Sequence, residues 1–246
     1  MNILSIDFII NGKNGFKENT LITGFHGIGT TGFIAIKYII DQIQAERVGT
    51  IISNQLPPFI TTKDGKISLP FEIFQKEENA MLIPHFQPYR NEHRIFSEKI
   101  VEWTMESQFK KAILIGGLDA RLKKDDGDKI RVIATSAFLE KYRDESLPIL
   151  EDGLFVTGPL ALMLTFFEIN DFPAIGLLPY AESSRVDPLA ASQAIKKINE
   201  LTSLDIETTK LIQDAELIEQ NLEEVITQTK DQQIDEKEQG SRRLYI

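Results

Sequence analysis

Short apolar runs alternate with longer amphipathic stretches through the first two thirds of the chain. The short runs are rich in isoleucine, valine, leucine and threonine, and turn residues such as Asn11-Gly12 bound them. Runs of this length and composition predict buried β-strands. The predicted strands cover residues 3–10, 20–25, 48–53, 80–83, 111–115, 130–135 and 172–178.

The longer stretches show helical periodicity. In the first of them, Phe33, Ile36, Ile40 and Ile43 recur at intervals that place them on one helix face. Because such stretches connect strands, we expect an α/β domain over residues 1–203, with a mostly parallel sheet flanked by helices. The predicted helices cover residues 32–43, 91–107, 158–167 and 188–201.

A β-hairpin is predicted as an attachment to this domain. Asp64-Gly65 is a tight-turn dipeptide between two apolar arms, residues 59–62 and 66–74. Pro70 has no N–H to donate to a neighbouring strand. The second arm is therefore expected to lie at a sheet edge or to be broken at the proline.

The pattern changes after residue 203. Leucine, alanine, isoleucine and valine then recur alternately four and three residues apart between Leu211 and Val225, on an acidic background. This spacing predicts an acidic amphipathic helix over residues 204–229 with Asp205 as its N-cap. Its narrow apolar stripe suits docking either on its own domain or across an oligomer. Residues 230–246 are predicted to form a flexible tail that ends in the apolar Leu244, Tyr245 and Ile246.

Composition narrows the function classes. The 246 residues include no cysteine, which excludes disulfides and thiolate chemistry and fits a cytoplasmic location. The net charge is −10, and residues 205–239 alone contain 11 acidic side chains and 3 lysines. Nucleic acid is a poor partner for such a surface, and no apolar run approaches the ~20 residues that a membrane helix needs.

A glycine-rich loop follows the second predicted strand and opens the first helix, a place where backbone N–H groups can bind phosphate. Its spacing matches the dinucleotide fingerprint, but the next strand ends at Asn54 and Gln55 instead of an acidic residue, and no P-loop lysine follows. We interpret the glycines as allowing a tight turn and close packing. The alternative is a nucleotide- or nucleoside-binding enzyme with a possible vestigial ligand loop of Gly24, His26, Gly27, Gly29 and Gly32.

No catalytic constellation is evident in the sequence. His26, His85 and His93 lack the spacing of a metal site, and no G-x-S-x-G nucleophile elbow occurs. We therefore predict no catalytic residues, no metal and no cofactor, and hence a protein that is not an enzyme.

Several segments together resemble one family. The loop segment LITGFHGIGTTG at residues 21–32, the segment GLFVTGPLALML at 153–164, Gly176-Leu177-Leu178-Pro179 and Arg185–Ala191 are similar to the corresponding motifs of the PAC2 (proteasome assembly chaperone) family. These segments are distributed over nearly the whole chain, and the acidic helix is in keeping with archaeal members.

The resemblance implies a nucleoside-phosphorylase-like α/β fold without the catalytic residues of a phosphorylase. It also implies a homo-oligomer that acts as a proteasome assembly chaperone or as an ATP-independent adaptor. Leu244-Tyr245-Ile246 matches the hydrophobic–tyrosine–any-residue tail that such proteins dock on the α-ring of the 20S proteasome. A third possibility is an oligomeric scaffold whose tail contacts a different partner.

Overall fold

The computed structural model describes residues 5–217, except residues 13, 59, 64, 126, 145 and 216. None of the helices in this part combines the length and the apolarity that a membrane span needs. The strands are β1 (Ile6–Ile10), β2 (Thr20–Gly24), β3 (Glu46–Ser53), β4 (Thr61–Lys63), β5 (Lys66–Ser68), β6 (Phe71–Lys76), β7 (Asn79–Pro84), β8 (Lys111–Ile115), β9 (Leu118–Asp119), β10 (Ile130–Ala134) and β11 (Ala174–Ala181). The helices are η1 (Ile28–Thr30), α1 (Thr31–Gln42), α2 (His93–Glu106), η2 (Ala120–Leu122), α3 (Ser136–Tyr142), α4 (Gly158–Ile169), α5 (Pro188–Leu201) and α6 (Thr209–Gln213).

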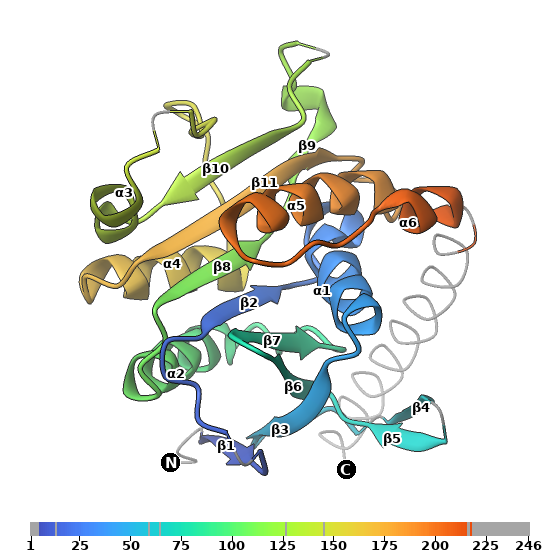
Figure 1. Cartoon of the computed structure of the whole chain (residues 1–246), viewed down its shortest axis with the longest axis vertical. Coiled ribbons are helices and arrows are strands. Elements are labelled where there is room, and N and C mark those ends of the chain that lie inside the picture. Colours follow the sequence, from blue (N-terminus) through green and yellow to red (C-terminus); the bar gives the residue numbers. More distant parts are fainter. Residues whose placement is uncertain are drawn as a thin grey trace, which may run out of the picture.

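A nine-stranded sheet forms the centre of the molecule, in the order β1-β3-β6-β7-β2-β8-β11-β10, with β9 beside β11 (Figure 1). β7, β2, β8 and β11 are parallel, and the short β9 is also parallel to β11. Antiparallel pairings join β6, β3 and β1 on one side and β10 on the other. The α/β class is therefore confirmed, with the parallel strands at the centre. β6 and β7 are antiparallel because the short turn at Glu77-Glu78 connects them.

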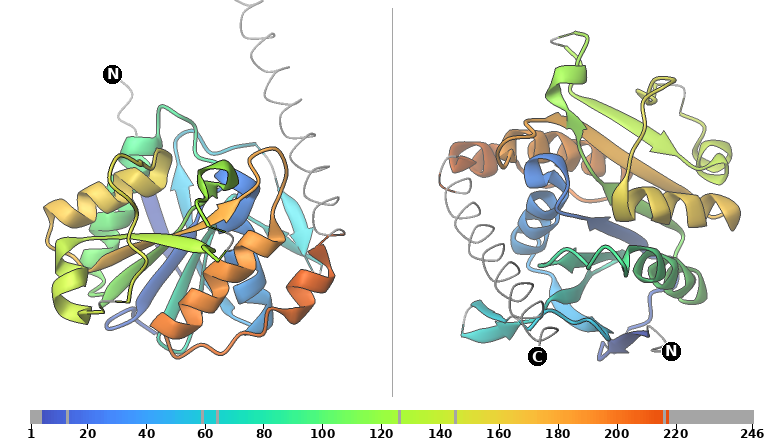
Figure 2. Two further views of the ribbon diagram at one scale, coloured as in Figure 1. Left: turned by 90° about the horizontal axis from the view of Figure 1, so that it is seen from above. Right: turned by 180° about the vertical axis from the view of Figure 1, so that it is seen from behind.

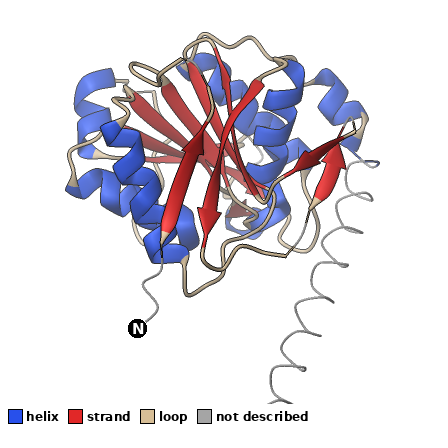
Figure 3. Ribbon diagram, turned by 90° about the horizontal axis from the view of Figure 1, so that it is seen from below, coloured by secondary structure: helices blue, strands red, loops and turns tan. Residues whose placement is uncertain are grey.

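Helices cover both faces of the sheet (Figures 2 and 3). α1 and α5 pack together on one face, where α6 contacts α5, and α2 and α4 pack together on the other face. Every residue of β2, β8 and β11 is buried. Burial on both faces explains why these strands read as continuous apolar runs in the sequence.

The two faces contain separate hydrophobic clusters. Along β2, Leu21 belongs to the cluster under α2 and α4, and its neighbour Ile22 belongs to the cluster under α1 and α5. This alternation follows from the two-residue period of a strand. The α2–α4 side is rich in aromatic rings, whereas the α1–α5 side is mostly aliphatic.

The predicted hairpin is present but shorter. β4 and β5 form their own two-stranded sheet, and Gly65 lies in the turn between them with φ of 73°. The predicted second arm is broken at Pro70, and its later part becomes β6 inside the main sheet. The strand predicted over residues 130–135 ends one residue early, because the Thr135 hydroxyl accepts a hydrogen bond from Phe138 N–H and caps α3.

The prediction that Asp205 caps a helix is wrong. α6 begins at Thr209, and Asp205 lies in the irregular segment before it, where the Asn199 side chain bonds both backbone groups of Ile206. Ile206 and Leu211 are buried in the cluster under α1 and α5, so the described start of the acidic segment packs on its own domain. The remaining seam positions Ile218, Leu222 and Val225 lie outside the described residues.

Candidate functional site

The outer glycines of the glycine loop allow backbone segments to pack closely. A Cβ atom on Gly24 would lie 2.6 Å from the Gly32 Cα, and a Cβ atom on Gly32 would lie 2.5 Å from the carbonyl oxygen of Ile115. The loop can therefore pass between β8 and the start of α1 only with glycine at both positions. This supports the interpretation of these two residues as packing glycines.

The middle of the loop is held in place by Asp187, a residue much later in the sequence. Gly29 has a φ of 61°, and its carbonyl oxygen accepts a hydrogen bond of 2.8 Å from Asp187 N–H. The Asp187 carboxylate in turn accepts hydrogen bonds from Ala190 N–H at 2.9 Å and from Glu182 N–H at 3.0 Å. One aspartate therefore connects the loop, the end of β11 and the start of α5.

His26 holds the loop in place through one hydrogen bond and one ring contact. Its Nε2 lies 3.0 Å from the carbonyl oxygen of Pro84, and since a carbonyl only accepts, Nε2 carries the proton. The ring also packs against Phe33, with 4.2 Å between ring centroids. Burial lowers the pKa of His26 from 6.5 to about 4, although the bond to Pro84 opposes this shift, so the imidazole is neutral near pH 7.

The buried carboxylate of Glu72 lies in the same part of the molecule, close to Phe33 through its partner His85. Glu72 accepts hydrogen bonds from Arg47 at 2.6 Å and from His85 at 2.9 Å, and the His85 ring is edge-on to Phe33 with 5.9 Å between ring centroids. Burial raises the pKa of Glu72, but the bonds from His85, Arg47 and the backbone of Leu69 outweigh burial and lower it overall. This cluster was not predicted from the sequence, where its signal is a single acidic residue inside the apolar run of β6.

The histidines do not converge on a metal site. His85 bonds Glu72, and the Nε2 of His93 lies 2.9 Å from the carbonyl oxygen of Pro88. Among the described residues, no group of three or more histidine, aspartate and glutamate side chains is arranged to hold a metal ion.

A pocket of about 710 Å³ opens beside Gly27, beyond the carboxyl ends of β2 and β8 and beside β11. In open α/β sheets this end of the strands is where ligands bind. A Cβ atom on Gly27 would meet no atom within 4 Å, so this glycine is not required for packing. The pocket is lined by Phe25, Gly27, Ile28, Gln87, His93, Ile115, Gly116, Gly117, Leu118, Asp119, Arg121, Leu122, Leu154, Phe155, Val156, Thr157, Gly158, Pro159, Leu160 and Leu178.

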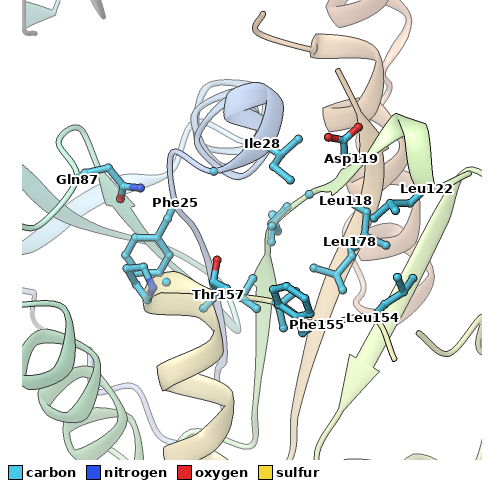
Figure 4. Close-up of a pocket in the computed structure, with 18 of the residues that line it drawn as sticks. Phe25, Ile28, Gln87, Leu118, Asp119, Leu122, Leu154, Phe155, Thr157 and Leu178 are labelled. Atoms are coloured by element: carbon cyan, nitrogen blue, oxygen red, sulfur yellow. The ribbon is translucent and has the colours of Figure 1, made fainter. Parts of the chain in front are cut away.

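The labelled lining residues lie on two sides of this pocket, and each side includes both apolar and polar residues. Figure 4 shows Phe25, Gln87 and Thr157 on one side and Leu118, Leu122, Leu154 and Leu178 on the other.

The one carboxylate among the described lining residues is Asp119, which receives hydrogen bonds from Arg121 at 2.6, 2.9 and 3.1 Å. These bonds hold the pKa of Asp119 well below its usual range. The Arg121 guanidinium, in turn, is engaged with this carboxylate.

The charges that line the pocket argue against the alternative that this protein is a nucleotide-binding enzyme. No lysine lies among the described lining residues, and the arginine there already pairs with a carboxylate. A phosphate group would find little compensating charge in such a site. Gly27 lines the pocket, whereas Gly24, His26 and Gly32 serve the packing of the loop, so the predicted ligand loop is only partly assembled around a cavity.

The predicted docking residues Leu244, Tyr245 and Ile246 lie outside the described residues. Their assignment to a site therefore remains a prediction from the sequence.

Comparisons with known proteins place the chain among related sequences and folds. The model of the PAC2 family matches residues 21–226. Two uncharacterized proteins of Methanocaldococcus jannaschii are similar in sequence: MJ1210, 24% identical over 85% of this chain and 83% of its own length, and MJ0106, 25% identical over 91% and 92%.

Solved structures show the same fold. Pyrococcus furiosus PbaA, described as an archaeal homolog of proteasome-assembly chaperone, has a TM-score of 0.82 at 19% identity and covers 93% of this chain and 100% of its own. Pyrococcus furiosus PbaB, described as an archaeal proteasome activator, has a TM-score of 0.72 at 18% identity, over 89% of this chain and 98% of its own.

Proposed function

The chain belongs to the PAC2 family, and on this premise we propose that it is a proteasome assembly chaperone or an ATP-independent adaptor of the 20S proteasome. The contact we propose is made by Leu244, Tyr245 and Ile246 on the α-ring. The protein acts in the cytoplasm, without a cofactor, and as a homo-oligomer.

The observation that carries the proposal is the extent of the likeness to PbaA, which includes all of that chain. A domain match alone would leave the function open, because one fold can host many functions. Here the same sequence also contains an apolar–tyrosine–apolar segment after a long acidic stretch, at residues 244–246.

The physical chemistry of this segment suits docking between ring subunits. Tyr245 can bury its ring in a pocket and donate its hydroxyl, and where Ile246 ends the chain its carboxylate can pair with a lysine. A single segment of this kind binds weakly, because ordering it costs conformational entropy. A homo-oligomer presents several copies at once, and their avidity offsets this weakness.

A non-catalytic role is in keeping with the described body. Burial lowers the pKa of His26 to about 4, which makes its imidazole a weak base near pH 7, and the Asp119 carboxylate is engaged by Arg121. The pocket wall is otherwise largely apolar.

The test is surface plasmon resonance of immobilised full-length protein with 20S proteasome from the same organism. We expect wild type to bind, and Tyr245→Ala and a chain ending at Arg243 to lose at least tenfold in affinity. Leu217→Ala is the matched control, because Leu217 is an exposed apolar residue that precedes the segment. A variant with Gly-Ser added after Ile246 separates the carboxylate from the side chains, and it is expected to fail.

Two outcomes would contradict the proposal. Equal binding by all variants would move the contact to the folded body. An absence of binding by wild type, with both mature proteasome and assembly intermediates present, would remove the proteasome as the partner.

A further inference from the structure

Large apolar side chains are exposed at the mouth of the pocket. Phe155 is 80% exposed and Leu122 is 43% exposed, and both line the pocket together with Leu154 and Leu178. Large apolar side chains that are gathered at a cavity, instead of scattered singly, mark a binding surface.

Polar groups at the same pocket are few and uncharged overall. The Thr157 hydroxyl precedes α4 but caps none of its N–H groups, and Figure 4 shows it directed into the open space beside Phe25. Asp119 and Arg121 neutralise each other at the rim. A fitting occupant is therefore mostly apolar, has an aromatic or branched body, and brings one hydroxyl or amide that can bond Thr157.

The chain itself contains a segment with this chemistry. Leu244 and Ile246 offer branched apolar side chains, and Tyr245 offers an aromatic ring with a hydroxyl. Residues 218–246 follow the described body, and even at the ~1.5 Å per residue of a helix they span roughly 40 Å. A domain of this size has a radius of gyration of about 17 Å, so the segment can reach the pocket.

We propose that the pocket beside Gly27 is a binding site for Leu244-Tyr245-Ile246 of the same chain, with Tyr245 placed against Phe155 and Thr157. Binding uses the three side chains and does not need a free carboxylate. A tethered segment has an effective concentration in the millimolar range, which favours this occupant over free peptides in solution. The regulatory consequence, that a segment held in the pocket is withheld from the proteasome, rests on the proposed function.

The direct test contains no proteasome. The probe is a fluorescein-labelled peptide of residues 236–246, in both acid and amide forms, and fluorescence anisotropy measures its binding. The receptors are full-length wild type and a full-length variant with Leu244→Ala, Tyr245→Ala and Ile246→Ala. We expect both peptide forms to bind the triple variant, and wild type to bind them about tenfold more weakly, because its own segment competes.

Pocket variants of the triple-alanine receptor locate the site. Phe155→Asp is expected to weaken peptide binding at least tenfold, and Thr157→Val by a smaller factor. Ile169→Asp is the control, because Ile169 is an exposed apolar residue at the opposite end of α4. A triple-alanine receptor that fails to bind either peptide, or binding that Phe155→Asp leaves unchanged, would overturn the inference. A proteasome interaction that fails while the peptide binds would overturn only the proposed function.

Discussion

On the side of the glycine loop that faces the sheet, Gly24 and Gly32 lie against backbone atoms, and the His26 ring is bonded to Pro84 and packed on Phe33. On the side that faces the pocket, Gly27 has open space, and the nearby Phe155 is largely exposed. The same glycine pattern therefore serves two purposes. The side that faces the sheet, here called the inner side, contributes to stability. The side that faces the pocket, here called the outer side, leaves room for a ligand.

Gly32→Ala is the strongest test of the inner side. The added Cβ would lie 2.5 Å from the Ile115 carbonyl oxygen and 2.7 Å from Phe25 N, and neither backbone atom can move without shifting a strand. We expect the free energy of unfolding to fall by more than about 3 kcal/mol, even though alanine favours helix by ~1 kcal/mol. Urea denaturation measures this loss.

Gly27→Ala is the control for that experiment, because a Cβ atom on Gly27 would meet open space and its φ of −99° is negative. Its stability should stay within about 1 kcal/mol of wild type. Equal losses in the two variants would show that the two sides of the loop are not distinct.

The pH dependence of stability is expected to show the effect of burying the His26 imidazole. Its folded pKa of about 4 lies below the ordinary value of 6.5, so between these pH values the unfolded chain binds the extra proton. Stability is full above pH 6.5 and falls as the pH decreases toward 4, by up to about 3 kcal/mol.

His26→Gln keeps a donor for the Pro84 carbonyl oxygen without a titratable ring. Urea denaturation from pH 7 to pH 4 should therefore show a smaller loss of stability for His26→Gln than for wild type. Parallel pH profiles for the two proteins would mean that the imidazole is not held neutral by burial.

Phe155→Asp is expected to have the smallest effect on stability. The side chain is 80% exposed, so its removal forfeits little buried area, and the free energy of unfolding should change by less than about 0.5 kcal/mol. Thermal unfolding at pH 7 measures this difference. A loss above about 1 kcal/mol would make Phe155 a packing residue and weaken the assignment of the outer side to binding.

Much of the fold around the inner side of the loop could be predicted from the sequence. β8 and α5 begin and end at the predicted residues, because buried central strands and amphipathic helices have strong local patterns. The packing interpretation of Gly24 and Gly32 also needed only their position between a strand and a helix.

The pocket could not be predicted in this way. Its wall comes from separate segments after β2 and β8 and before α4, and only the tertiary fold brings these together. In the sequence, Phe155 resembles a core residue of an apolar run, yet the structure leaves it exposed. The Glu72 cluster was missed for the same reason, because Arg47 and His85 come from other strands and loops.

The bond between Asp187 and Gly29 also has a consequence for the order of events during protein synthesis. A ribosome that adds ~5–20 residues per second completes position 187 roughly eight to thirty seconds after position 29. Until then, the Gly29 carbonyl oxygen lacks the N–H that holds it in the finished protein. The loop that lines one wall of the pocket therefore reaches its final bonding only after ~160 further residues have been added.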